Sequence, residues 1–317
     1  NEWYVYREAN GLDAETSKRI KHLVFNLFPL RFLPTENKVI RAEKVTVTIT
    51  YTESPKILAP LTGVKNIIIT SPTLEEYAVE LAEWKNNTGI PSKVLNTTWI
   101  YSHYIGVDNP EKIRNCIKDF VSNYGIIYVT IFGDADQVPV RSAYVPDGHD
   151  TYTPTDLYYA DLDGTWDDNS DGLYADQRCD NVDFKPDVYV GRIPPSLASY
   201  AQTAVDKIKG YQQHFDTSQN WTRKILLAAG TGHNGVEDPF GIAFPFLKDY
   251  ISELTYDKDI VKLYESYGNL STSSMASQIN EGCLFLNFAG HGDPGTGLLD
   301  AGWLFYWVIP GLIWNGF

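Results

Sequence analysis

The sequence predicts an α/β protein with parallel sheets in two subdomains and a small β domain before them. From Lys65 onward, short apolar runs alternate with helical stretches, and this alternation starts a second round near Trp221. The residues before Lys65 follow a different, period-two pattern. We therefore expect a β domain over 1–62, a first α/β subdomain over 63–215 and a second over 216–317.

The N-terminal segment has a strand pattern in "KVTVTITY", residues 44–51. Its apolar side chains (Val45, Val47, Ile49 and Tyr51) alternate with threonines and Lys44. Period-two alternation is typical of a half-buried strand, so we expect one here.

The first α/β subdomain has clear helix boundaries. Ser71 and Pro72 open one helix that ends at Gly89, while Asn109 caps a second that stops at Gly125. The elements expected in order are strand 66–70, helix 71–89, helix 109–125, strand 126–132 and helix 199–213.

The second α/β subdomain repeats this alternation after the polar stretch 214–220. The expected elements are strand 224–230, helix 243–254, strand 259–264, a short helix over 274–280 and strand 283–289. His291 follows the last of these strands. Open α/β sheets bind their ligands at the carboxyl ends of the strands, so His291 is placed where a site is expected.

Composition excludes several classes of function. With 26 basic and 40 acidic residues the net charge is −14, which disfavours binding to nucleic acid or anionic membranes. Three cysteines do not form a disulfide framework in a chain of 317 residues. The longest apolar run, 303–314, contains Pro310 and is too short to span a bilayer.

Tyrosine richness and several glycosylation sequons favour a secreted or cell-surface protein. The sequons begin at Asn86, Asn96, Asn220 and Asn269. The chain starts at Asn1 without a methionine or a signal-peptide pattern, so we expect any targeting segment to have been removed.

The histidine of "AGHGD" is a candidate general base. Gly290 and Gly292 leave space around His291, and imidazole titrates near neutral pH. The alternative is a simple turn in which the histidine caps a helix or faces water.

An aspartate-rich stretch, "YYADLDGTWDDNSDG", is a candidate cation site because clustered carboxylates repel one another unless a hard cation neutralises them. The expected calcium ligands are Asp161, Asp163, Asp167, Asn169 and Asp171. Arg178 stands where an EF-hand has its twelfth-position glutamate, so the loop is not an EF-hand. A solvated acidic loop and, less favoured, a catalytic carboxylate pair are the alternatives.

A glycine-rich stretch, "GTGHNG" from Gly230 to Gly235, matches the GxGxxG pattern of dinucleotide-binding sites. Asp257 lies at about the distance downstream at which such sites have their ribose-binding acid. Pro239 and Gly241 interrupt the helix that such a site needs, so we do not expect one.

The cysteines do not have the surroundings of an activated nucleophile. Cys116 and Cys283 lie on apolar faces, where burial raises the pKa of a thiol. Cys179 stands among aspartates, whose charge disfavours the thiolate. GxSxG, HExxH and CxxC motifs are absent from the sequence.

Seven segments in order resemble the gingipain family of cysteine peptidases, from Lys65 to the C-terminal residue. They are "LAEWKNNTGIPSKV", "GVDNPEKIRNCIKDF", "IFGDADQVPVR", "TDLYYADLDGTWDDNSDG", "PDVYVGRIP", "KILLAAG" and "FAGHG". The preceding "FPLRFLPTENKVI" is similar to the domain that precedes catalysis in such proteins. The resemblance implies a caspase-like parallel-sheet sandwich in two subdomains, calcium binding and hydrolysis of peptide bonds by a His–Cys dyad.

Carried onto this sequence, the resemblance makes His291 the catalytic histidine and the backbone N–H near Gly292 an oxyanion donor. The family's acidic residue that orients the histidine falls at Gly232, which leaves Glu237 and Asp238 as substitutes. The family's cysteine lies on a strand beyond Phe317. We therefore expect a C-terminal continuation, or a cleaved second chain, to carry the nucleophile and to cover the apolar segment 303–317. The alternative function is a catalytically silent calcium-binding scaffold at the cell surface or outside the cell.

Overall fold

The computed structural model describes residues 3–13, 18–33, 37–50, 63–146, 151–213, 220–230, 243–255, 257–289, 292–293, 296–299 and 302–305. The chain forms two compact units, residues 1–205 and 206–316, which divide inside helix α5 (Ala198–Gln213). The subdomain boundary expected at 215/216 falls just after the end of this helix.

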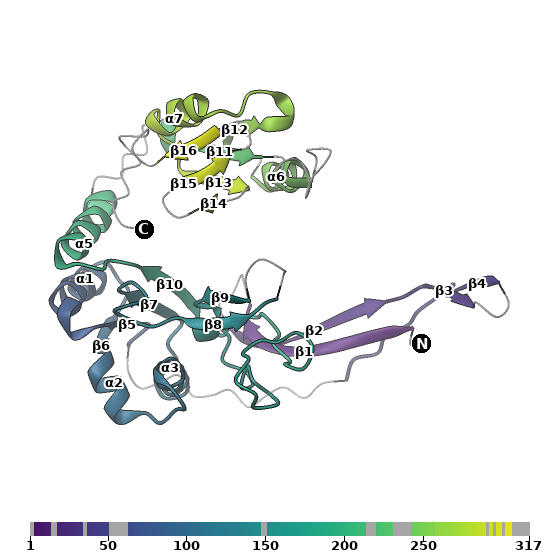
Figure 1. Ribbon diagram of the computed structural model, residues 1–317, viewed down its shortest axis with the longest axis horizontal. Helices are drawn as coiled ribbons and strands as arrows, with labels where there is room; N and C mark the ends of the chain where they lie inside the picture. Colours follow the sequence, from purple (N-terminus) through teal and green to yellow (C-terminus); the bar gives the residue numbers. More distant parts are fainter. Residues whose placement is uncertain are drawn as a thin grey trace. The chain divides into compact units, whose positions relative to one another are not determined.

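The N-terminal residues form two antiparallel hairpins, labelled in Figure 1. The first pairs β1 (Tyr4–Leu12) with β2 (Arg19–Leu27), and the second pairs β3 (Leu30–Leu33) with β4 (Lys38–Arg41). The end of β1 packs against the rest of unit 1. Ala9 and Leu12 are buried there, and the Leu12 N–H donates to the Pro186 carbonyl at 2.8 Å.

The prediction of a strand over 44–51 is wrong for residues 44–50, the part that the structure describes. These residues pair with no other strand. Val45, Val47 and Ile49 are each about half exposed. The segment lies across the face of the first hairpin that carries Tyr6 and Phe25, and β1 and β2 already pair with each other. Alternation predicts which side chains share a face, but a strand also needs a partner edge for its backbone, and the alternation does not supply one.

Unit 1 contains a parallel sheet with strand order β10-β7-β5-β6. Its strands are β5 (Asn66–Thr70), β6 (Ser92–Asn96), β7 (Tyr128–Phe132) and β10 (Tyr189–Ile193). All five residues of β5 are buried, as a central parallel strand covered on both faces requires. The parallel sheet predicted from the alternation of strands and helices is confirmed.

Helices α1 (Glu75–Asn87), α2 (Thr97–His103) and α3 (Asn109–Tyr124) accompany this sheet, and the Ile67 and Ile69 side chains share one buried cluster with α3. A 3-10 turn, η1 (Pro72–Leu74), precedes α1. Asp108, and not Asn109, caps α3, because its carboxylate accepts the Glu111 N–H at 3.0 Å while Asn109 is already helical. Gly125 ends α3 in the left-handed conformation, as expected, with φ 63°.

The remaining elements of unit 1 surround the aspartate-rich stretch. Strands β8 (Arg141–Tyr144) and β9 (Tyr152–Thr155) pair antiparallel, and the short helix α4 (Leu157–Ala160) ends one residue before Asp161. Residues 161–188 then run without helix or strand to β10, so side-chain and turn hydrogen bonds must hold this segment.

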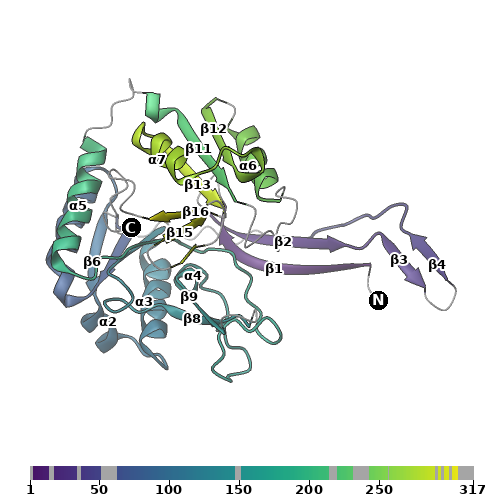
Figure 2. The same cartoon turned by 45° about the horizontal axis from the view of Figure 1, so that its top comes forward.

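Unit 2 contains a second parallel sheet with strand order β12-β11-β13. Its strands are β11 (Lys224–Ala229), β12 (Asp259–Tyr264) and β13 (Phe285–Ala289). Helix α6 (Ala243–Leu254) packs on the face that carries Ile225, Leu227 and Tyr264, and α7 (Thr272–Asn280) packs on the other (Figure 2). The second round of strands and helices is therefore confirmed.

A small antiparallel sheet follows β13 and consists of β14 (Gly292–Asp293), β15 (Thr296–Leu299) and β16 (Gly302–Phe305). Residues 306–317, which include most of the apolar C-terminal segment, lie outside the described residues. Among the helices that the structure describes, none is both long enough and apolar enough to cross a membrane.

Candidate functional site

The strands of unit 2 end together at one edge of the sheet. Ala229, the last residue of β11, pairs with Ala289 of β13 on one side and with Tyr264 of β12 on the other. The Gly230 N–H continues the ladder and donates to the Ala289 carbonyl at 2.9 Å. The chain therefore leaves β13 toward His291 from the same edge at which β11 and β12 end.

The residues predicted for catalysis fall mainly outside the described part of the chain. His291, Glu237 and Asp238 are all outside the described residues. Gly292 begins β14 and pairs with Gly297. The roles assigned to these four residues stay predictions.

Sequence reasoning missed a carboxylate at this edge, that of Glu265. Glu265 follows β12 directly and opens the 3-10 turn η4 (Glu265–Tyr267). A methyl group placed on Gly230 would lie 3.6 Å from the Glu265 Oε2 atom and 3.8 Å from the Ala289 carbonyl oxygen. Its position directly after a strand that neighbours β11 was the available signal.

The three thiols are in surroundings that oppose ionisation. Burial raises the pKa of Cys116 to about 12, and Cys116 is fully buried. Desolvation also raises the pKa of Cys283. For the exposed Cys179, desolvation and then the charges of Asp176 and Asp180 raise the thiol pKa. The prediction that these cysteines are not activated is confirmed for their pKa values.

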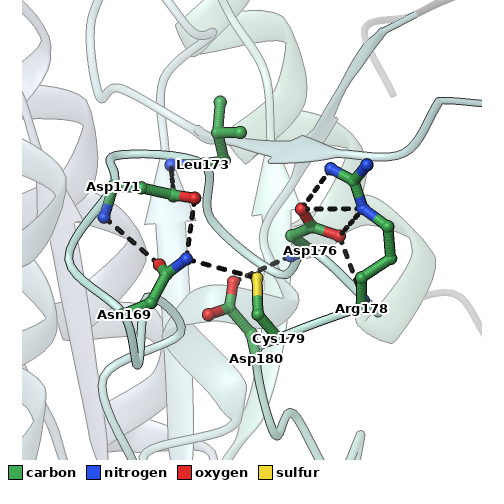
Figure 3. Close-up of polar contacts among 7 residues, drawn as sticks. All are labelled: Asn169, Asp171, Leu173, Asp176, Arg178, Cys179 and Asp180. Atoms are coloured by element: carbon green, nitrogen blue, oxygen red, sulfur yellow. Dashed lines mark hydrogen bonds and ion pairs between the residues drawn. The ribbon is translucent and has the colours of Figure 1, made fainter.

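The aspartate-rich stretch separates into two groups, of which the first is a self-capped turn. The Asp167 carboxylate accepts the N–H groups of Asp171 and Gly172 at 3.0 Å each. Asp171 in turn accepts the Leu173 N–H at 2.8 Å and the Asn169 side-chain amide at 2.8 Å (Figure 3). These oxygens accept backbone N–H groups and one side-chain amide of the same loop.

A neighbouring strip of the chain joins this turn. Figure 3 shows Cys179 and Asp180 beside the turn, and the Asn169 amide lies 3.4 Å from the Cys179 sulfur. The Asp180 carboxylate accepts the N–H groups of Asp168 and Asp176, both at 2.8 Å. The loop is therefore closed across about a dozen residues by side-chain to backbone bonds.

The second group, Asp161 and Asp163, has different surroundings. Asp161 is 2% exposed, and its Oδ2 atom has no hydrogen-bond partner. Burial, and next the nearby charge of Asp183, raise the pKa of Asp161 to about 7. Asp163 accepts both the backbone and the side-chain N–H groups of Asn10, each at 3.1 Å, which ties the N-terminal hairpin to the acidic stretch.

Arg114 fixes the backbone of the second group. Arg114 is 2% exposed, and its guanidinium donates to the carbonyls of Asp161 at 2.7 Å, Asp163 at 2.6 Å and Gly164 at 3.1 Å. The charge of Arg114 therefore lies beside Asp161 while its donors are used by carbonyl oxygens. Such a buried, multiply bonded arginine is typical of a structural role.

Two carboxylates near Asp161 were also missed by sequence reasoning, those of Asp183 and Asp187. Both raise the pKa of Asp161 through their charge, and Asp187 accepts the Leu162 N–H at 2.8 Å. They lie some twenty residues after Asp161 along the chain, and only the fold brings them close to it.

The described residues contain no group of three or more His, Cys, Asp or Glu side chains arranged to hold a metal ion. The calcium site predicted at Asp161, Asp163, Asp167, Asn169 and Asp171 is not tested by this observation alone, since a cation can draw carboxylates together, and it stays a prediction. Asp161 is the member whose environment fits a cation best, because a buried carboxylate oxygen without a partner is costly.

Comparison with known proteins identifies the chain. The model of peptidase family C25 matches residues 59–301. The chain belongs to this family. The resemblance to the gingipain family is thereby confirmed, and the C25 match includes both parallel sheets and the His291 segment.

Solved structures of gingipains share the fold of this C25 chain. The Arg specific cysteine proteinase gingipain R (RgpB) superposes with a TM-score of 0.54 at 19% identity, over 77% of this chain and 51% of the other. The complex of Porphyromonas gingivalis RgpB pro- and mature domains gives 0.51 at 20% identity, over 74% and 49%. The expected α/β, caspase-like fold class is confirmed.

A sequence relative of this C25 chain is an uncharacterized protein of Archaeoglobus fulgidus. The two are 28% identical over 234 residues, which is 68% of this chain and 50% of the relative. The chain thus spans about half the length of the proteins it matches.

Proposed function

We propose that this chain is the part of a gingipain-like cysteine endopeptidase that supplies the catalytic histidine, His291. The observation that carries the proposal is membership of peptidase family C25, in a segment where a glycine-flanked histidine follows a strand ending at the sheet's carboxyl edge. The substrate class is a protein or peptide.

The reaction is acyl transfer through a covalent intermediate. His291 takes the proton of the cysteine thiol, and the resulting thiolate attacks the peptide carbonyl. The imidazolium then protonates the leaving amine, and water hydrolyses the thioester. Backbone N–H groups near Gly292 are suited to bind the developing oxyanion.

The nucleophilic cysteine comes from a further polypeptide, either a C-terminal continuation or a cleaved second chain. The raised pKa values of Cys116, Cys179 and Cys283 support this, since a nucleophile needs a lowered one. The sheet order β12-β11-β13 also supports it, because within the described residues the outer edge of β13 has no partner strand and can accept another.

Calcium is proposed as a structural cofactor, held by the acidic stretch. The unpartnered, buried oxygen of Asp161 supports a cation there, and the carboxylates that adjoin it add negative charge. A secreted or cell-surface location agrees with tyrosine richness and with the sequons.

A catalytically silent, calcium-binding scaffold with a peptidase fold is the second candidate. Gly232 stands where the family has the acid that orients the histidine, and this observation favours the scaffold. Fold alone does not establish activity.

The deciding experiment uses protein from the natural source, its intact mass and a thiol-directed peptide probe. The endopeptidase predicts label on a segment beyond Phe317 that disappears in the His291→Ala variant. A mass that ends at Phe317, with no associated chain and no label, would establish the scaffold instead. Thiol-sensitive turnover by residues 1–317 alone would show that one of the three cysteines here is the nucleophile.

A further inference from the structure

We infer that residues 44–50 are an interaction surface through which two copies of this chain pair as antiparallel strands. In the single chain this segment is not a strand, because within the described residues it has no strand to pair with. A second copy of the same segment supplies the missing partner. The inference concerns assembly and does not depend on the proposed peptidase activity.

The backbone of residues 44–50 is open within the described part of the chain. The segment runs without helix, turn or bend. Just before it, the Ala42 N–H donates to the Pro29 carbonyl at 2.9 Å, but no backbone hydrogen bond joins residues 44–50 to another described segment. A row of free N–H and C=O groups is satisfied best by another extended chain, in which such groups repeat at the same spacing. The partner that fits this edge is therefore a β-strand.

The side chains of the segment favour such pairing. Every residue from 45 to 50 is valine, isoleucine or threonine, and these β-branched residues pack well across paired strands. Val45, Val47 and Ile49 are each about half exposed. Proteins protect exposed edges with charges, prolines or bulges, but residues 45–50 contain no charged residue and no proline. This edge is therefore open to a partner.

The first hairpin gives the segment a firm backing (Figure 1). Residues 45–50 share a groove with the hairpin face that carries Tyr6 and Phe25, whose rings stack with centroids 5.9 Å apart. The two strands of the hairpin pair along nine residues each. A partner strand beside residues 44–50 would extend a two-layer arrangement that is already present.

The segment is complementary to itself in an antiparallel register centred on Val47. The opposed pairs are Val47 with Val47, Thr46 with Thr48, Val45 with Ile49 and Lys44 with Thr50. Aliphatic side chains thus meet aliphatic ones and threonines meet threonines, which are favourable cross-strand pairs. Lys44 is the only charge in the segment, and the two lysines lie at opposite ends of the pair. A chain with net charge −14 can therefore approach its copy here without opposed carboxylates.

The symmetry of the pair is also consistent with the hairpins. The two-fold axis of an antiparallel pair is normal to the two strands, so both copies keep their hairpin on the same side of the new ribbon, next to each other. The contact is isologous and closes at two copies. We therefore expect a dimer.

The first test measures self-association of the 317-residue chain by sedimentation equilibrium, at loadings from about 1 to 100 µM. We expect a reversible equilibrium between monomer and dimer. Val47→Lys and Val47→Glu each place like charges opposite each other and should weaken the dimer on the order of 10-fold or more. An equimolar mixture of the two variants should restore the dimer, because lysine then faces glutamate.

Disulfide trapping tests the register in a Cys179→Ser background, which removes the exposed native thiol. Val47→Cys should form an interchain disulfide with oxidised glutathione, because opposed residues in paired strands lie within disulfide reach. Val45→Cys should link much less by itself, and its mixture with Ile49→Cys should link again. Circular dichroism checks that each variant is folded.

Three results would overturn the inference. The first is a monomer at every loading, and the second is an open-ended assembly in place of a dimer. The third is a dimer that folded Val47→Lys leaves unchanged, or in which Val45→Cys links as readily as Val47→Cys, because the two copies would then meet elsewhere or in another register.

Discussion

The Arg114 guanidinium binds the backbone carbonyl of Asp161, at 2.7 Å, and leaves an oxygen of the buried Asp161 carboxylate without a partner. One residue of α3 thus fixes where the acidic stretch begins. The charge of Arg114 lowers the pKa of Asp161, but burial and the charge of Asp183 outweigh it, so the pKa is still raised. Both consequences can be measured.

Replacing Arg114 with methionine should destabilise the fold strongly. Three carbonyl oxygens would lose their donor, that of the buried Asp161 and the less buried ones of Asp163 and Gly164, and an unsatisfied buried group costs about 1–3 kcal/mol. We expect a loss of about 3 kcal/mol or more in the free energy of unfolding, measured by urea denaturation. The exposed Arg7→Met control should change it by less than about 0.5 kcal/mol, and equal losses in the two variants would contradict the role of Arg114.

Asp161 should make the metal-free protein less stable as the pH rises. Its pKa is about 7 in the folded state and 3.8 in the reference state, so between these values the folded protein keeps a proton that the unfolded chain releases. Stability therefore falls from about pH 4 to pH 7 and is level above. In EDTA, Asp161→Asn should remove about 1–3 kcal/mol of this dependence, as measured by thermal melts across that range. A variant with the wild-type pH slope would refute the assignment.

Calcium removal should lower the melting temperature. A ligand that binds only the folded state stabilises it by mass action, by about 2.7 kcal/mol at a hundred times the dissociation constant. Scanning calorimetry with EDTA and with added calcium measures the difference. Asp161→Asn should reduce the response and Asp259→Asn, on an exposed residue of unit 2, should not. Identical melts, with no calcium found by elemental analysis, would exclude the site.

Asn269 should be important for the end of β12. Asn269→Ala removes an acceptor from the Tyr264 N–H and a donor from the Lys262 carbonyl. We expect a loss of about 1–3 kcal/mol in stability and faster hydrogen exchange at the Tyr264 amide. Asn269→Asp should keep the first of these bonds and lose less. Unchanged exchange at Tyr264 in the alanine variant would contradict the structure of this turn.

Much of the architecture follows from the sequence because its signals are local. Ile67–Ile69 is an apolar run of β-branched residues, which favours a buried strand, and Gly125 readily adopts the left-handed conformation that ends a helix. The two rounds of strand and helix, the parallel sheets and the position of His291 after β13 could all be predicted in this way. The structure of segment 44–50 could not be predicted in this way. Its alternating pattern is a local signal, but a strand forms only where the backbone finds the edge of another strand to pair with.

The sequence by itself determined the family, the α/β class and the residues with suitable chemistry. Only the tertiary structure decided which of them meet. Asp183 and Asp187 adjoin Asp161, Asn10 binds Asp163 across 153 positions, and Glu265 reaches the end of β11. Spacing along the chain carries no information about such contacts. They depend on the register of parallel strands and on buried groups such as Arg114, which position distant backbone segments through their hydrogen bonds.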